Sequence, residues 1–228
     1  MAAASGLVGL TKVNLREQAL ASLRTAITSG QLPPESPMVE TELSEQLGIS
    51  RGTLREAMRQ LQQEGLLTAK ARGRLYVRKL GPKEIADVFE VRAALEALAA
   101  TSLARRDDRH VAVAELRRRL DAMDRAMVDI DLEGRIEADL AFHRALCRLT
   151  DNEMLLHTWE TIEGSIRMSI MWAGIQRAAG NMDVPRHHAV VDAIESGSAD
   201  RAAAAVHDHM SWAAANLTPP ATVAGRAG

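Results

Sequence analysis

Residues 40–79 read ETELSEQLGISRGTLREAMRQLQQEGLLTAKARGRLYVRK, and this stretch decides the fold of the N-terminal part of the chain. It predicts two short helices joined by a tight turn at Gly48, and then a two-stranded hairpin with Arg72 and Arg74 at its tip. A second helix of this size fits the major groove of DNA, and a basic hairpin can contact the duplex beside it. The stretch therefore predicts a helix-turn-helix followed by a basic wing.

The flanking sequence completes this predicted domain. Apolar residues recur at helical spacing over Leu15–Ile27, and Gly30 ends that helix where a left-handed residue is favoured. Ser50 can cap the second helix of the motif, which is expected to run to about Glu64. Gly73 permits a positive backbone angle in the hairpin turn. The two strands of the hairpin are expected at 66–69 and 75–77.

The composition narrows the class of protein. The chain has 228 residues, of which 46% are hydrophobic and only 3% aromatic, so a mostly helical fold is expected. A single cysteine, Cys147, excludes an internal disulfide framework and fits a reducing compartment. The N-terminus lacks the basic flank and apolar run of a signal peptide, and no stretch reaches the roughly 18 apolar residues of a membrane helix. We therefore expect a cytoplasmic protein without a membrane partner.

Charge and helical periodicity divide the chain into two domains. Of the 28 basic and 30 acidic residues, 11 and 7 lie at or before Lys79, which leaves 17 and 23 beyond it. The basic first part is the one suited to a polyanion. Pro82 fits the first turn of a new helix. The predicted divisions are a flexible N-terminus at 1–11, a winged helix-turn-helix at 12–80, a helical bundle at 81–217 and a disordered tail at 218–228. The bundle is expected to contain about six helices, at 83–105, 109–129, 132–149, 152–178, 184–196 and 199–217.

The first turn of the second motif helix carries residues suited to base readout. Arg51 and Arg55 are four residues apart and share a face, and arginine can hold guanine through two hydrogen bonds worth about 1–3 kcal/mol of discrimination. Ser50 caps this turn, and Thr53 can contact a phosphate or a thymine methyl. The alternative is that Arg51, Arg55 and Arg59 form a solvated helix face. Their position at the helix start, beside a basic hairpin, favours DNA.

Four polar residues of the second domain form a candidate metal site. Asp139 and His143 are four apart and lie on one helical face. His187 and His209 lie 11 residues before and after Ser198, so an antiparallel pair of helices would bring both to the same height. One carboxylate and three imidazoles suit a divalent metal, with zinc foremost and nickel, manganese, cobalt or iron as alternatives.

Two other interpretations of these residues stay open at this point. An Asp and a His at this spacing are most often a surface pair or a core histidine with a satisfied partner. His188 and His207 are neighbours of the two later histidines and could be the inward-facing pair, because helical phase alone does not identify the buried side.

The N-terminal part resembles a known family. The strings LREQALASLRTAITSGQL, ELSEQLGISRGTLREAMRQL and EGLL are similar to the winged-helix domain of the GntR family of bacterial transcription regulators. The resemblance implies that Arg51, Thr53 and Arg55 contact operator DNA, and that Gly73 in the wing approaches the minor groove. Two positions depart from the pattern. LPPES stands where the family usually has a Pro-Gly turn, and Thr41 stands where many members carry a DNA-contacting arginine.

The C-terminal part resembles the helical FCD domain of the FadR subfamily of GntR regulators. The matching strings are DVFEVRAALEALAA, DLAFHRALCRLTDNEMLL, HHAVVDAIESG and AAVHDHM. The resemblance implies that Asp139, His143, His187 and His209 are metal ligands, with His187 rather than His188 in register.

The same resemblance implies that the domain senses small organic acids. Arg92 matches an inward-pointing position and could bind an effector carboxylate, although an i,i+4 salt bridge with Glu96 is an equal alternative. Arg167 is a second effector-binding candidate. The bundle interior is expected to contain Trp159, Trp172, Met168 and Met171.

The sequence as a whole predicts a repressor that binds operator DNA as a homodimer. Its affinity for DNA is expected to depend on a small carboxylate effector bound in the metal-containing helical domain. No catalytic residue is predicted. Two alternatives remain, namely a metal-dependent hydrolase fused to a DNA-binding module, and a regulator whose helical domain is a metal-free scaffold.

Overall fold

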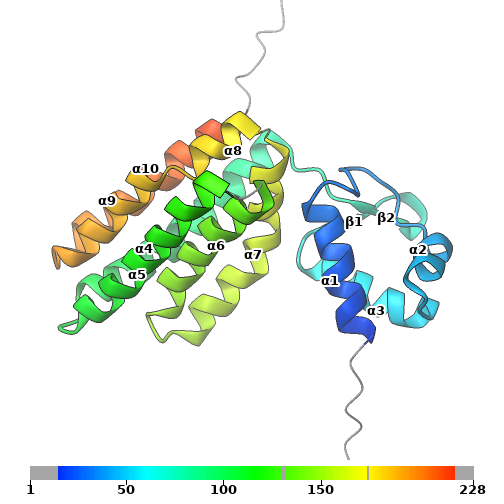
Figure 1. Ribbon diagram of the computed structural model, residues 1–228, viewed down its shortest axis with the longest axis horizontal. Helices are drawn as coiled ribbons and strands as arrows, with labels where there is room; N and C mark the ends of the chain where they lie inside the picture. Colours follow the sequence, from blue (N-terminus) through cyan, green and yellow to red (C-terminus); the bar gives the residue numbers. More distant parts are fainter. Residues whose placement is uncertain (1–14, 130–131, 174, 219–228) are drawn as a thin grey trace, which may run out of the picture.

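The computed structural model describes residues 15–129, 132–173 and 175–218. The predicted flexible segment 1–11 and the predicted disordered tail, apart from Thr218, lie outside these residues. The N-terminal part contains three helices and one hairpin (Figure 1). They are α1 (Leu15–Thr28), α2 (Glu40–Leu47), α3 (Arg51–Gln63), β1 (Leu67–Ala69) and β2 (Leu75–Val77).

The turns of the helix-turn-helix form for the reasons predicted. Gly48 ends α2 with a φ of 63°, and the Ser50 hydroxyl accepts a hydrogen bond from the Thr53 amide at 3.1 Å at the start of α3. The strands are antiparallel, with Leu67 opposite Val77. The hairpin turn contains one more left-handed residue than expected, because Arg72 has a φ of 66° next to Gly73 at 72°.

The departure at LPPES places a side chain where backbone conformation favours glycine. Glu35 has a φ of 68°, a left-handed conformation that costs a non-glycine residue roughly 1–2 kcal/mol. Its amide donates to the carbonyl oxygen of Val77 at 2.9 Å, so the segment lies along β2. The Glu35 carboxylate is 3.2 Å from the Lys70 ammonium and 3.5 Å from that of Lys79. These contacts hold the segment in place against the backbone cost.

The C-terminal part is a bundle with one more helix than the six expected. Within the described residues its helices are α4 (Pro82–Ala104), α5 (Arg109–Asp129), α6 (Leu132–Arg148), α7 (Glu153–Trp172), α8 (Ile175–Asn181), α9 (Val184–Glu195) and α10 (Ala199–Leu217). The single helix predicted over 152–178 is therefore wrong. The sequence has a glycine at position 174, between α7 and α8, and glycine is a poor helix former. No helix among the described residues is long and apolar enough to cross a membrane.

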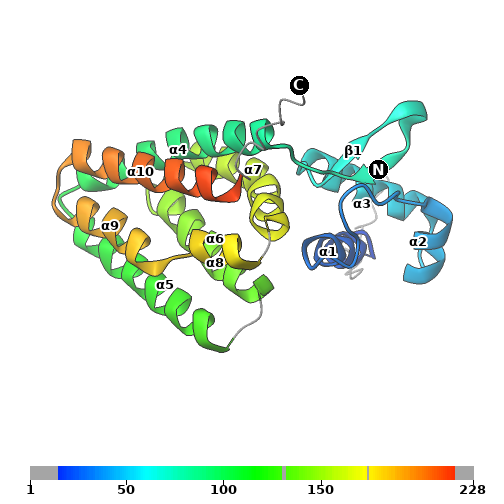
Figure 2. The ribbon, with the colours of Figure 1, turned by 90° about the horizontal axis from the view of Figure 1, so that it is seen from above.

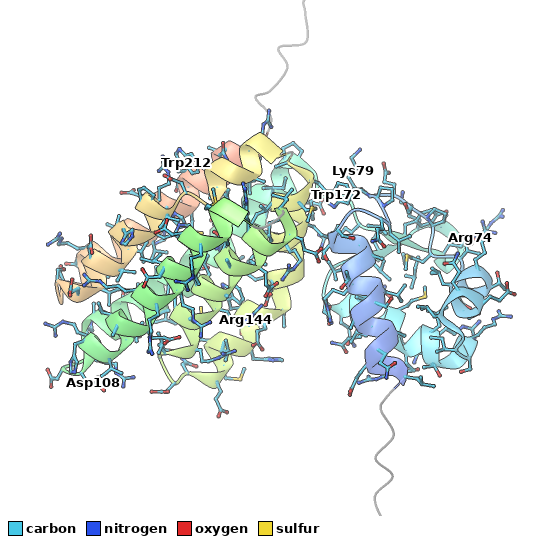
Figure 3. All side chains as sticks on the ribbon, in the orientation of Figure 1. Arg74, Lys79, Asp108, Arg144, Trp172 and Trp212 are labelled. Carbon is cyan, nitrogen blue, oxygen red and sulfur yellow. The ribbon has the colours of Figure 1, made fainter. Side chains whose placement is uncertain are left out.

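Each part has its own hydrophobic core, and α7 contributes to both. Trp159 is fully buried in the bundle core, as predicted. Met168, expected in the same interior, instead packs into the core of the N-terminal part. Trp172 is 38% exposed and its ring lies against Gly30, so its predicted place inside the bundle is wrong. Figures 1 and 2 show α7 on the side of the bundle that faces the N-terminal part, and Figure 3 shows Trp172 between the two.

Candidate DNA-reading surface and histidine cluster

The predicted DNA-reading side chains lie on one exposed surface at the start of α3. The side chains of Arg51 and Arg55 are 59% and 54% exposed. The hydroxyl groups of Ser50 and Thr53 are 2.8 Å apart and hydrogen-bonded to each other. The wing residues Arg72, Gly73 and Arg74 are also exposed. Figure 3 shows Arg74 on the part of the molecule far from the bundle, where it is accessible to a large partner.

Sequence reasoning missed an acidic residue on this surface. Glu40, at the start of α2, accepts a hydrogen bond from Arg55 Nε at 2.8 Å and lies 3.7 Å from a terminal nitrogen of Arg51. The two arginines therefore share one carboxylate across the helix-turn-helix. Glu40 is the first residue of the stretch 40–79, but only the packing of α2 against α3 reveals the contact.

The structure brings Asp139, His143, His187 and His209 together inside the bundle. All four side chains are buried, none with more than 5% exposed surface. Asp139 and His143 come from α6, His187 from α9 and His209 from α10. The three imidazoles each offer a nitrogen atom within 4.8 Å of the others. By contrast, His188 and His207 are exposed, which removes the alternative inward-facing pair.

The hydrogen-bond partners of His143 and His187 fix which ring nitrogens are free. His187 Nδ1 lies 2.8 Å from the carbonyl oxygen of Asp183, which can only accept, so this nitrogen carries the proton. His143 Nδ1 lies 2.6 Å from Glu96 Oε2 and donates to that carboxylate in the same way. In the neutral rings both Nε2 atoms then hold lone pairs, yet they are 3.0 Å apart. Two lone pairs facing each other at this distance require a proton or a cation between them.

Other polar atoms of the cluster are also without partners. Among the residues that the structure describes, both carboxylate oxygens of Asp139 and Nδ1 of His209 are buried and lack a hydrogen-bond partner. Asp139 Oδ1 lies 3.1 Å from His187 Nε2 and 3.8 Å from His143 Nε2. Unsatisfied buried polar groups are costly, and a cation would satisfy these. The donor set is the one that zinc and related divalent metals prefer, so the residues fit a metal ion.

Burial favours the neutral form of two of the three imidazoles. Burial lowers the pKa of His143, and nearby Arg92 lowers it further. The pKa of His209 is well below its usual value, chiefly from burial and then from the other two imidazoles. Burial opposes ionisation of Asp139, but a proton on the facing His187 and His143 rings lowers its pKa. Neutral imidazoles and an ionised carboxylate are the forms that bind metals.

Arg92 and Glu96 form the second layer of this site. Arg92 Nε donates to Glu96 Oε1 at 2.8 Å, and both side chains are 1% exposed, so the i,i+4 salt bridge considered for Arg92 is present. One terminal nitrogen of Arg92 is buried without a partner in the described part of the chain. Trp159 Nε1 also donates to Glu96 Oε1, at 2.9 Å. Burial alone would raise the pKa of Glu96, but its interactions with His143 and Arg92 lower it.

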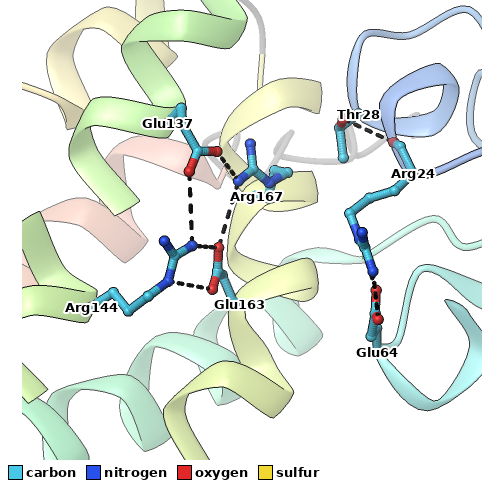
Figure 4. Close-up of polar contacts among 7 residues, drawn as sticks. All are labelled: Arg24, Thr28, Glu64, Glu137, Arg144, Glu163 and Arg167. Atoms are coloured by element: carbon cyan, nitrogen blue, oxygen red, sulfur yellow. Dashed lines mark hydrogen bonds and ion pairs between the residues drawn. The ribbon is translucent and has the colours of Figure 1, made fainter. Parts of the chain in front are cut away.

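Arg167, the second effector-binding candidate, lies in different surroundings. Its guanidinium pairs with Glu137 and is 3.5 Å from Glu163, which also pairs with Arg144 (Figure 4). These residues line a groove of about 810 Å³ between the bundle and the N-terminal part. The charge of Arg167 is balanced there by these carboxylates.

Comparisons with known proteins agree with both parts of the fold. Residues 15–77 match the domain described as bacterial regulatory proteins, gntR family, and residues 87–211 match the FCD domain. The "Probable D-xylose utilization operon transcriptional repressor" of Paenarthrobacter nicotinovorans is 31% identical over 207 residues, 88% of each chain. The Nta operon transcriptional regulator of Aminobacter aminovorans is 36% identical over 137 residues, 60% of this chain and 64% of that protein.

Two solved structures have the same fold. Escherichia coli McbR/YncC superposes with a TM-score of 0.71 at 20% identity, over 90% of this chain and 98% of that one. A GntR regulator from Rhodococcus sp. RHA1 gives 0.75 at 22% identity, over 89% and 96%. A winged helix-turn-helix joined to a helical effector-binding domain defines a DNA-binding transcription regulator. The chain belongs to the GntR family of bacterial regulators, and its helical part is an FCD domain.

Proposed function

We propose that this regulator is a repressor that reads a near-palindromic operator as a homodimer and responds to a small organic acid. The main supporting observation is the pair of facing Nε2 atoms of His143 and His187, with the buried carboxylate of Asp139 3.1 Å from His187 Nε2. Asp139, His143, His187 and His209 would hold a divalent metal, with zinc foremost. A bound metal of this kind supplies a Lewis-acid position that a carboxylate can occupy. The relative from Paenarthrobacter nicotinovorans, named as a repressor, supports the direction of regulation.

The chain's own residues would prepare this site for an anionic ligand. Glu96 and the Asp183 carbonyl orient two of the imidazoles through their Nδ1 protons. The terminal nitrogen of Arg92 that has no partner in the described part of the chain would bind a carboxylate next to the metal. The buried position of the cluster would exclude bulk water and strengthen these interactions.

Base readout would come from α3 and the wing. Arg51, Thr53 and Arg55 would contact base edges or phosphates in the major groove, positioned by the Ser50 cap. Arg72, Gly73 and Arg74 would follow the adjacent backbone and minor groove. The left-handed conformation of Arg72 and Gly73 makes the turn tight and supports a close approach of the wing to the duplex.

The homodimer contact would use one face of α4. Val91, Ala94 and Leu98 follow each other at spacings of three and four residues and are all exposed, Leu98 by 51%. A two-fold contact requires a self-complementary surface, and an apolar helical stripe meets that requirement. In Figure 2, α4 lies along the outer edge of the bundle, where a second copy can reach it.

The hydrolase alternative has less support. Glu96 is the carboxylate nearest to His143 that is not a predicted ligand, and it already accepts hydrogen bonds from three side chains. A general base needs a free lone pair directed at water. Zinc-dependent turnover of a small ester that is lost in His143→Ala would restore the hydrolase interpretation.

The proposed function is tested by DNA binding under controlled occupancy. A duplex is first selected from a random pool with the zinc-loaded protein. Its affinity is then measured for metal-free protein, for zinc-loaded protein and for zinc-loaded protein with a panel of small carboxylates. We expect selection of a near-palindrome and at least one acid that weakens binding only when zinc is present. An affinity that is indifferent to zinc and to every acid would contradict the sensing role and favour the scaffold alternative.

A further inference from the structure

One face of α7 contacts the turn that follows the recognition helix α3. A Cβ atom placed on Gly164 would lie 2.6 Å from the carbonyl oxygen of Glu64 and 3.2 Å from Leu66 Cγ. Such distances leave no room for a side chain, so the two backbones are in direct contact. Ser165 faces Gly65 at the same turn, and Met168 is 1% exposed within the N-terminal core. The joint between the domains is therefore tightly packed.

The residue held at this joint also organises the recognition helix. Glu64 is the C-terminal cap of α3, and its carboxylate accepts hydrogen bonds from Arg24 of α1 at 3.1 and 2.8 Å (Figure 4). A displacement of α7 against Glu64 would consequently act on the C-terminal end of α3, the helix whose first turns carry Arg51 and Arg55.

The opposite side of α7 contacts the histidine cluster through one intermediate residue. Trp159 Nε1 donates to Glu96 at 2.9 Å, and Glu96 accepts from His143 Nδ1 at 2.6 Å. Trp159, Glu96 and His143 are each no more than 1% exposed, so the contacts run through close-packed interior.

Both sets of contacts belong to the same uninterrupted helix. Trp159 and Met168 are nine residues apart, about 13 Å along the axis and half a turn apart in direction. We propose that α7 couples occupation of the histidine cluster to the attachment of the winged helix, with Trp159 following Glu96 on one side and Gly164 holding the Glu64–Leu66 turn on the other. This inference rests on the proposed metal centre.

The coupling follows from the shared imidazole. His143 would hold a cation through Nε2, which would restrict the ring, and the same ring donates to Glu96 through Nδ1. Glu96 in turn fixes Trp159, so α7 becomes less mobile and the turn that packs on Gly164 opens less often. The backbone amide of Leu66, which donates to the Leu61 carbonyl at 2.9 Å, lies in that turn and reports its opening.

Hydrogen–deuterium exchange of the full chain tests this coupling without knowledge of the operator. Zinc is added to metal-stripped protein, its binding is measured by calorimetry, and exchange is followed in peptides covering 62–68. We expect zinc to slow exchange there by at least about fivefold, the lower limit of typical coupling between sites. A rate that stays within about twofold while zinc binds would overturn the inference and leave the metal centre standing.

Two variants separate the coupling from general stability. Trp159→Phe keeps an aromatic ring but removes the donor to Glu96, and should bind zinc while losing the exchange response. Trp212→Phe is the matched control, because Trp212 stacks on Arg186 at 3.7 Å and not on Glu96, and its response should equal that of the wild type. Gly164→Ala should bind zinc normally and exchange rapidly in 62–68 with or without it.

The remaining outcomes also decide the matter. A full zinc response in Trp159→Phe, or a protected joint in Gly164→Ala, would show that α7 does not carry the coupling. Failure of the wild type to bind zinc or any other divalent metal would overturn the metal centre, and the inference with it. Circular dichroism of each variant ensures that a lost response is not a lost fold.

Discussion

Arg55 and Glu40 are joined across the helix-turn-helix by a 2.8 Å hydrogen bond from Nε to a carboxylate oxygen. This contact uses one edge of the guanidinium and leaves the terminal nitrogens for another partner. More than half of the Arg55 side chain remains exposed. Glu40 therefore orients an arginine whose terminal nitrogens can still bind a guanine.

Arg51→Ala or Arg55→Ala should each weaken binding to the selected duplex by about 1–3 kcal/mol and relax the preference at one base pair. Arg59→Ala is the control, because it removes the same charge from the same helix but its guanidinium pairs with Glu56 at 2.7 Å. It should reduce affinity for all duplexes by a similar small factor. Electrophoretic mobility shifts with single-base variants of the duplex measure both effects. Equal losses in all three variants would indicate a solvated charged face.

Glu40→Gln should raise affinity for random DNA and lower the selectivity for the preferred duplex. The substitution removes a negative charge next to Arg51 and Arg55, which strengthens phosphate contacts, but it also releases the arginine from its orientation. The affinities for selected and random duplexes at two salt concentrations check this prediction. Unchanged selectivity would mean that Glu40 has no orienting role.

His187→Ala should reduce zinc affinity by more than the 10- to 100-fold that is typical of losing a partner outside the ligand set. His188→Ala is the matched control, because His188 is the next residue on α9 and is exposed. Calorimetric titration of metal-stripped protein gives both affinities. If the two variants lose affinity equally, zinc binds at the surface and the buried cluster is packing alone.

The metal-free protein should lose stability as the pH falls below about 6.5, the usual pKa of histidine. The folded protein holds the pKa of His209 well below that value, mainly by burial and then by the other two imidazoles. Below pH 6.5 the unfolded chain binds protons that the folded chain does not, so the free energy of unfolding falls as the pH is lowered. The full free energy of unfolding is reached only above that pH. Urea unfolding at pH 7.5, 6.0 and 5.0 provides the measurement. The free energy of unfolding should change less with pH in His209→Ala than in His207→Ala, because the side chain of His207 is exposed.

Local sequence signals were sufficient for most of the fold. Gly48, Ser50 and Pro82 mark helix ends or starts through their own backbone chemistry, and each occupies the predicted place. The break near 174 has a local signal in its glycine, but the positions of Met168 and Trp172 depend on packing between the domains. An amphipathic pattern identifies a buried face but not the domain that buries it, so Met168 and Trp172 could not be assigned correctly.

In the candidate site, too, some contacts have a local sequence signal and others do not. The spacing around Ser198 places His187 and His209 at the same height, because two antiparallel helices joined by a short turn have a fixed register, but burial in the structure is what excludes His188 and His207. Their rings are 4.4 Å apart in the structure. The i,i+4 spacing identifies Glu96 only as a partner of Arg92, because its contact with His143 spans 47 residues of sequence. Contacts of that range arise from the tertiary fold, and a single sequence contains no local signal for them.

Leu98→Lys should convert the dimer to a monomer while the bundle stays folded. Leu98 is 51% exposed on α4, in line with Val91, so a charge there would be buried without a partner in a two-fold contact between apolar stripes. Val111→Lys is the control, because Val111 is 58% exposed on α5, outside the stripe. Analytical ultracentrifugation at micromolar concentration should show a monomer for Leu98→Lys and a dimer for Val111→Lys and the wild type.

Binding to a two-half-site duplex should weaken in Leu98→Lys, because each half-site must then be occupied separately. A stable dimer of Leu98→Lys would place the contact on another surface.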